Sequence, residues 1–114
     1  MDNSILDSIK KLLGISLEDD TFDMDVIIHI NTVFSILNQL GVGPDGGFSI
    51  SDNTTTWDEY INDNKLLNDV ITYVYLKTQL IFDPPTTSSV TEAKNKMISE
   101  LEFRMNVTVD DQKG

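Results

Sequence analysis

His29 is the single histidine of this 114-residue chain, which contains no cysteine. Cysteine nucleophiles, disulfides and thiolate metal sites are therefore excluded, and a Ser–His–Asp triad would have to use His29. No partner for such a triad stands at a recognisable spacing in the sequence. The side chain falls between the apolar and the polar face of an expected helix, so we interpret His29 as a residue at the boundary of the core.

Five carboxylates stand close together in the sequence, at Glu18, Asp19, Asp20, Asp23 and Asp25. Such a group could bind a divalent cation, and a pair of carboxylates could hydrolyse a glycosidic bond. The glycine and the final glutamate of an EF-hand loop are missing at the required spacing. A glycosidase also needs a cleft, which a chain of this size rarely builds. We interpret the group as the solvated start of a helix and predict no metal site.

A glycine-rich stretch spans residues 41–47. The P-loop pattern G-x-x-x-x-G-K-S/T is absent, and the glycines follow an expected helix, whereas a dinucleotide fingerprint follows a strand. We therefore interpret the stretch as a turn. The sequence predicts no enzyme and no cofactor.

Charge and composition exclude further classes of protein. The chain has 8 basic and 19 acidic residues, which gives a net charge of −11 and a pI of about 4.1. This balance disfavours a grip on nucleic acid through neutralised phosphates. An apolar run long enough to span a membrane and the features of a signal peptide are both missing from the sequence. The absence of cysteine fits a cytoplasmic origin.

The hydrophobic periodicity predicts an all-α fold, a small bundle of about four main helices with one short extra helix. Ser4 is the expected N-cap of the first helix, which ends at Gly14, and Lys10 and Lys11 suit the negative end of its dipole. Capping boxes at Thr56–Glu59 and Ser89–Glu92 predict two further helix starts. The main helices are expected at 4–13, 23–40, 65–82 and 89–105, with the short helix around Trp57, Tyr60 and Ile61.

Two segments are expected to lie outside the helices. Residues 41–52 form a Gly/Pro loop, in which the alternation at Phe48–Ile50 could give a short strand. Residues 106–114 show no helical pattern and are expected to be a flexible C-terminal tail. The chain is thus predicted to have one helical domain, 1–105, followed by the tail, 106–114.

The expected helices at 23–40 and 65–82 are apolar around much of their circumference. Ile28 and Ile36, for example, fall outside the main apolar stripe of the first of these helices. Exposed apolar area in a small protein usually marks an interface, so the sequence predicts self-association.

Four features occur in an order that resembles a known family. A helix ends at Leu40-Gly41-Val42, and the turn W-D-E-Y-I follows at 57–61. The segment Y-V-Y-L-K-T-Q-L-I-F-D-P-P then spans 73–85, before a helix that carries Glu92, Glu100, Glu102 and Arg104. Over about residues 2–105 the chain resembles the head–tail connector, or head-completion adaptor, proteins of long-tailed bacteriophages and prophages.

The resemblance implies a structural virion protein. Its subunits would form a homo-oligomeric ring, of dodecamer type, that docks on the portal after DNA packaging, extends the DNA channel and connects head to tail. The implied partners are further copies of the chain, the portal protein, and the next head-completion or tail protein. DNA would pass without specific binding, and no membrane is involved. The location would be the head–tail junction of the virion, and the host cytoplasm during assembly.

The resemblance also indicates candidate interface residues. Contacts to another subunit or to the portal are expected at Ile28, Ile36, Tyr73, Tyr75, Phe82, Arg104, Val107 and Val109, and the C-terminal tail would reach into the portal. Acids expected to face the channel are Asp19, Asp20, Asp58 and Glu59, because an acidic lumen repels DNA phosphates.

One alternative from another class remains open. A small acidic binding module, such as a DNA mimic that inhibits or regulates a DNA-handling protein, would share this composition. A mimic needs carboxylates at phosphate-like spacing, whereas many acids here stand at expected helix starts.

Overall fold

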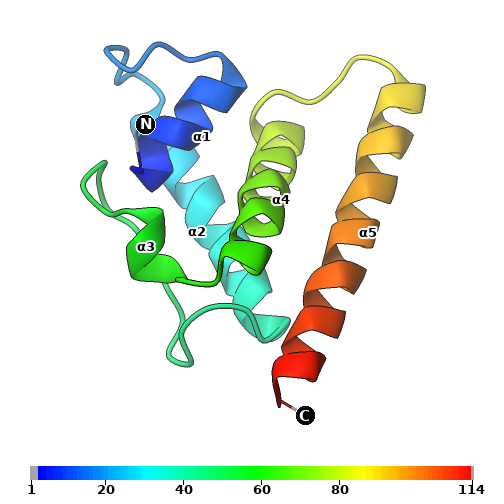
Figure 1. Ribbon diagram of the computed structural model, residues 1–114. Helices are drawn as coiled ribbons and strands as arrows, with labels where there is room; N and C mark the ends of the chain where they lie inside the picture. The colour runs from blue at the N-terminus through cyan, green and yellow to red at the C-terminus, as the bar shows by residue number, and fades with distance from the viewer. Residues whose placement is uncertain (1–2, 114) are drawn as a thin grey trace.

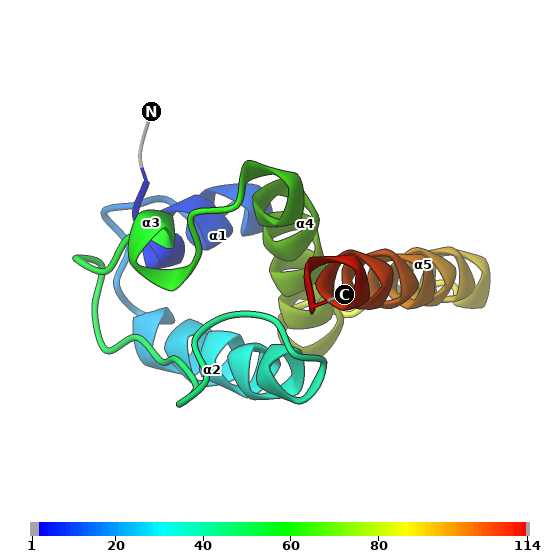
Figure 2. The same ribbon diagram turned by 60° about the horizontal axis from the view of Figure 1, so that its bottom comes forward.

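The computed structural model describes residues 3–113, which form five helices and almost no strand. In chain order these are α1 (Ile5–Leu13), α2 (Asp23–Gln39), α3 (Trp57–Tyr60), α4 (Asn64–Phe82) and α5 (Ser88–Lys113). α4 is the central element and packs against α1, α2 and α5 (Figure 1). Figure 2 shows α5 on one side of α4, with α1 and the start of α2 on the other. The all-α prediction is confirmed.

The ends of α1 lie where the sequence predicts them. The Ser4 hydroxyl accepts a hydrogen bond of 3.2 Å from the Asp7 N–H, which satisfies one of the free donors at the helix start. Gly14 follows the last turn with φ 81°, a left-handed conformation that closes the helix with bonds to the carbonyls of Lys10 and Lys11. Ile5, Leu6 and Ile9 of α1 are buried, whereas Leu12 in its last turn is exposed.

The core is formed where the apolar stripes of α2 and α4 meet. Val26, Ile30, Val33, Phe34 and Leu37 of α2 are all buried and recur at helical spacing. Val70, Tyr73 and Val74 of α4 are completely buried as well. Burial of one such side chain contributes about 1.5–3 kcal/mol, so this contact supplies much of the driving force for folding.

α3 is a single helical turn that closes one end of the core. The Glu59 carboxylate accepts a hydrogen bond of 2.7 Å from the Thr56 N–H, as the predicted capping box requires. The Trp57 indole N–H donates to the Ser8 hydroxyl at 2.8 Å, which ties α3 to α1. The Tyr60 ring packs on Phe34, with the two ring centroids 4.6 Å apart.

The predicted short strand at Phe48–Ile50 is wrong, since these residues form no strand. A side chain takes the place of a neighbouring strand: Asn31 of α2 donates to the Ile50 carbonyl at 2.9 Å and accepts from the Ile50 N–H at 2.7 Å. The backbone of buried Ile50 is thereby satisfied without a sheet. The described residues contain one isolated β-bridge, between Ser4 and Thr56.

Gly43 has a conformation in the loop after α2 that requires glycine. Its φ is 91°, and an added Cβ would lie 2.6 Å from the Tyr60 ring. Any other residue would both strain the backbone and displace a buried aromatic side chain.

α5 differs from its prediction at both ends. Ser89 lies inside the helix, because α5 begins at Ser88 and the Thr91 N–H bonds to the Thr87 carbonyl. The helix also continues to Lys113, so the expected non-helical tail is wrong over residues 106–113. Its buried seam, Ile98, Leu101 and Met105, continues at Val109, which shares a hollow with Val42 and Leu66. Gly114 lies outside the described residues.

Candidate functional site

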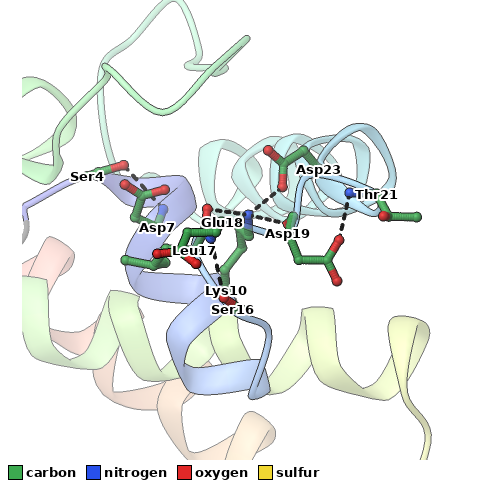
Figure 3. Close-up of polar contacts among 9 residues, drawn as sticks. All are labelled: Ser4, Asp7, Lys10, Ser16, Leu17, Glu18, Asp19, Thr21 and Asp23. Atoms are coloured by element: carbon green, nitrogen blue, oxygen red, sulfur yellow. Dashed lines mark hydrogen bonds and ion pairs between the residues drawn. The ribbon is translucent and has the colours of Figure 1, made fainter.

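Lys10 forms the most elaborate polar contact of the described residues, and it was not predicted. Its side chain is 2% exposed, although the sequence suggested only a helix-dipole role for it. The ammonium donates to the Asp19 carbonyl at 2.8 Å and to the Leu17 carbonyl at 3.4 Å, and forms a 2.7 Å ion pair with Asp23 (Figure 3). One buried cation therefore joins α1, the following loop and the first turn of α2.

The sequence did carry a signal for this contact. Lys10 stands one turn after Leu6, on the buried side of α1, and an acidic loop follows within ten residues. A long side chain at that position can bury its methylene groups and still bring its charge to the loop.

Because Lys10 holds the backbone of the loop, the loop acids point outward. Asp19 and Asp20 are exposed. Hydrogen bonds from the Thr21 side chain and the Thr21 backbone N–H lower the pKa of Asp19, so this carboxylate stays charged in moderately acidic solution.

The other two candidate channel acids lie on a different segment. Asp58 and Glu59 are exposed residues of α3, and the Glu59 carboxylate accepts the backbone N–H of Thr56, the N-cap of that helix. The four acids thus belong to two separate segments. One segment is the loop before α2 and the other is the helix α3, and both lie on the side of the molecule away from α5 (Figure 1).

The candidate interface residues divide into surface and core. Ile28, Arg104 and Val107 are exposed, whereas Ile36, Tyr75 and Phe82 are half-buried. Phe82 meets the Phe22 ring edge-on at 5.4 Å, and the Lys94 ammonium lies 6.0 Å from the centre of the Tyr75 ring.

Tyr73 and Val109 belong to the core and cannot form part of a surface. Tyr73 is completely buried, and its hydroxyl donates to the Glu102 carboxylate at 2.6 Å. Burial and this hydrogen bond raise the pKa of Tyr73. The sequence interpretation failed here because Tyr73 and Tyr75 lie on different sides of α4, and their types do not show which side faces the core.

Among the residues that the structure describes, the two most exposed large apolar side chains were missed. Met24 on α2 is 71% exposed and Phe103 on α5 is 70% exposed. Phe103 stands between Leu101 and Met105, which both belong to the buried seam, so its position off the seam could have identified it. Met24 lies in the acidic first turn of α2, where an apolar residue is easily taken for part of the core.

Two of the grooves on the described surface adjoin α1. One, of about 640 Å³, lies between α1, the start of α2 and the loop at Ile50–Asn53. The other, of about 680 Å³, lies between α1, α3 and α4 and is lined mainly by apolar side chains such as Leu12, Leu17 and Ile71.

The part of the chain that the structure describes contains neither a cluster of metal ligands nor a membrane-spanning helix. His, Asp and Glu side chains there do not gather in threes that could hold a metal ion. None of the helices between residues 3 and 113 has the length and hydropathy of a membrane span.

Comparison with known families identifies the class of protein. Residues 5–112, nearly the whole chain, match the phage connector protein family. The chain therefore belongs to the phage connector proteins, a structural family with no implied catalytic function. No significant match is found among curated proteins or among solved structures.

Proposed function

We propose that this connector protein forms a ring that docks on the portal at the capsid vertex, extends the DNA channel and joins head to tail after packaging. The observation that carries the proposal is the family match over residues 5–112. Membership of the connector family implies interaction with other head or tail proteins of the virion. The proposed partners are further copies of the chain, the portal, and the next head-completion or tail protein.

The surface supports a role in assembly. Exposed apolar side chains stand on both sides of the central helix α4, at Met24 and Ile28 of α2 and at Phe103 and Val107 of α5. A ring needs two different contact patches on each subunit, because each copy meets one neighbour on either side. We propose that Ile28, Ile36, Tyr75, Phe82, Arg104 and Val107 contribute to contacts with subunits or portal.

The charge supports passage of DNA without binding. A net charge of −11 generates a negative field around the protein, which repels phosphates. We propose that Asp19, Asp20, Asp58 and Glu59 line the channel, since all four are exposed in the single chain. The proposed location is the head–tail junction of the virion, after assembly in the host cytoplasm.

In vitro joining of heads and tails tests this role. DNA-filled heads that carry the portal but lack this protein are mixed with tails, with and without the purified chain. The proposal expects joined particles only when the chain is present. Equal joining in both mixtures, or no joining in either with active tails, contradicts it.

A further inference from the structure

The groove between α1, α2 and the loop at Ile50–Asn53 is bordered by carboxylates and by no basic side chain among the described residues. We call it the acid-rimmed groove. Its apolar lining consists of Leu6, Met24, Ile27 and Ile50, and its acidic lining of Asp20, Asp23 and Asp52. Among the described residues, no lysine or arginine lines it. A side chain that fits this groove is therefore apolar and accompanied by positive charge.

The hydrogen bonds of the rim acids decide which of them can meet a partner. Hydrogen bonds from the Thr54 hydroxyl at 2.6 Å and the Thr54 N–H at 2.9 Å lower the pKa of Asp52. The Lys10 ammonium pairs with Asp23 from inside the molecule. Asp20 and Asp52 are exposed and remain available to a partner.

α5 presents a surface with the complementary properties. Its outer ridge, Lys96, Glu100, Phe103, Arg104 and Val107, is exposed over its whole length. Phe103 and Val107 stand one helical turn apart, and Lys96 stands two turns before Phe103, so they share one side of the helix. Arg104 pairs with Glu100 at 3.0 Å and lies 4.0 Å from Asp69. Exposed ion pairs of this kind contribute little and can be exchanged for new ones.

The ridge and the groove of one chain cannot meet. α4 lies between α5, which carries the outer ridge, and α1 (Figures 1 and 2). Among the described residues, none from α5 lines the acid-rimmed groove. A contact between them must join two molecules. Because the two patches differ, such a contact is head-to-tail and can repeat around a ring.

Charge complementarity determines which partner can bind in the acid-rimmed groove. Two copies of a chain with net charge −11 repel each other unless acids on one meet bases on the other. The outer ridge brings two exposed cations, Lys96 and Arg104, and the exposed Phe103 ring next to Arg104 against the carboxylates of Asp20 and Asp52. Glu100 stands between the two cations and exchanges its pair with Arg104 for solvent when the new contact forms. The groove volume of about 640 Å³ leaves room for the aromatic ring.

We propose that Phe103 of one copy inserts into the acid-rimmed groove of a second copy, with Lys96 and Arg104 placed against Asp20 and Asp52. This inference rests on the proposed function, in which the chain forms a ring, and it specifies the two surfaces that meet. The interface would combine an aromatic anchor with charge pairing at its rim, the usual pattern for a binding hot spot.

Cross-linking between two single-cysteine variants tests the contact, since the natural chain contains no cysteine. Met24→Cys places a thiol in the groove and Val107→Cys places one on the outer ridge. The two proteins, one with a mass tag, are mixed with a short bismaleimide, with and without the portal. The proposal expects the mixed dimer. The matched control replaces Met24→Cys by Thr72→Cys, an exposed site on α4, and should give little mixed product.

Three further variants separate this contact from nonspecific association. Phe103→Glu in the Val107→Cys background should lower the yield of mixed dimer about tenfold. Val90→Glu, at an exposed position of α5 thirteen residues before Phe103 and on a different side of the helix, should change it by less than about twofold. Asp20→Lys with Asp52→Lys should lower the yield as Phe103→Glu does.

Each outcome distinguishes the two proposals. No mixed dimer under either condition, or like-with-like dimers of Val107→Cys alone, overturns the head-to-tail contact. If the chain still binds the portal in that case, the proposed function stands without this interface. Mixed dimers from a chain that never binds the portal would support the contact and contradict the portal role.

Discussion

At the scale of single residues, Lys10 is the clearest case of one side chain positioning several others. Its ammonium joins two backbone carbonyls and the Asp23 carboxylate across three segments. The loop that it holds supplies Asp20 to the acid-rimmed groove, and the first turn of α2 supplies Asp23. We therefore expect this buried cation to stabilise the fold and the groove together.

Lys10→Met tests the contribution of the buried charge. Loss of one partner of a buried ion pair costs about 3–5 kcal/mol, and partial exposure of Asp23 reduces this to about 2 kcal/mol of unfolding free energy. Lys11→Met, at the exposed neighbour, should cost less than about 0.5 kcal/mol. Urea unfolding measures both. Equal stability of the two variants would show that the buried contact contributes nothing.

A double-mutant cycle isolates the pair itself. Asp23→Asn removes the charge from the other side, and the double variant should lose less than the sum of the two single losses. The same urea experiment gives the coupling free energy. Strictly additive losses would contradict a direct interaction between Lys10 and Asp23.

Tyr60 and Tyr73 make the free energy of unfolding depend on pH in alkaline solution. Burial raises the pKa of both phenols above their ordinary value of 10.0, and the Glu102 hydrogen bond adds to the effect at Tyr73. Unfolded tyrosines lose their protons above that value while the folded ones keep theirs. The stabilisation is thus complete below pH 10.0 and is lost as pH rises, by about 1.4 kcal/mol per pH unit for each tyrosine.

Urea unfolding between about pH 9 and about pH 11 measures this slope. The double variant Tyr60→Phe, Tyr73→Phe should be less stable at neutral pH, because Tyr73 loses its bond to Glu102, but its slope should be clearly smaller. An unchanged slope in the double variant would contradict the role of these two phenols.

At the scale of elements, two segments owe their structure to contacts that a linear pattern does not reveal. The loop around Ile50 is held by the side chain of Asn31, nineteen positions earlier in the chain. The last turns of α5 are held by the burial of Val109 near Val42 and Leu66. In both cases a tertiary contact overrides a local preference for strand or for coil.

Asn31→Ala should destabilise the loop by about 2–3 kcal/mol, since the N–H and the carbonyl of buried Ile50 both lose their partner. Asn38→Ala, at an exposed position of the same helix, should be nearly neutral. Thermal unfolding followed by circular dichroism compares the two. Similar melting temperatures for both variants would show that the loop does not need the Asn31 amide.

Val109→Asp should cost about 2–3 kcal/mol, because it places a charge in the buried seam between α5 and the rest of the core. Val107→Asp, two residues away on the exposed side, is the matched control and should cost less than about 0.5 kcal/mol. Equal effects would mean that the end of α5 is detached from the core in solution.

These segments show what the sequence alone could predict. α1, α3 and the starts of α2 and α4 followed from caps and apolar spacing, because those signals act over one or two turns. The burial of Lys10 and Tyr73 and the exposure of Met24 and Phe103 depend on which side of a helix meets another helix. Residue type does not carry that information, so the surface needed the structure.

At the scale of the whole molecule, the arrangement separates two surfaces. α4 occupies the centre, with α5 on one side and, on the other, α1 and the start of α2, which line the acid-rimmed groove (Figure 2). A connector protein with unlike patches on opposite sides can add neighbours in one direction until a ring closes. The strong negative charge keeps single copies apart, so we expect high salt to favour association.

The mass of the protein in solution, measured by light scattering alone and with the portal of the same phage, tests the connector role most directly. The expected result is either a ring-sized particle or a monomer that joins the portal in stoichiometric amounts. A monomer that ignores the portal at every salt concentration would contradict it.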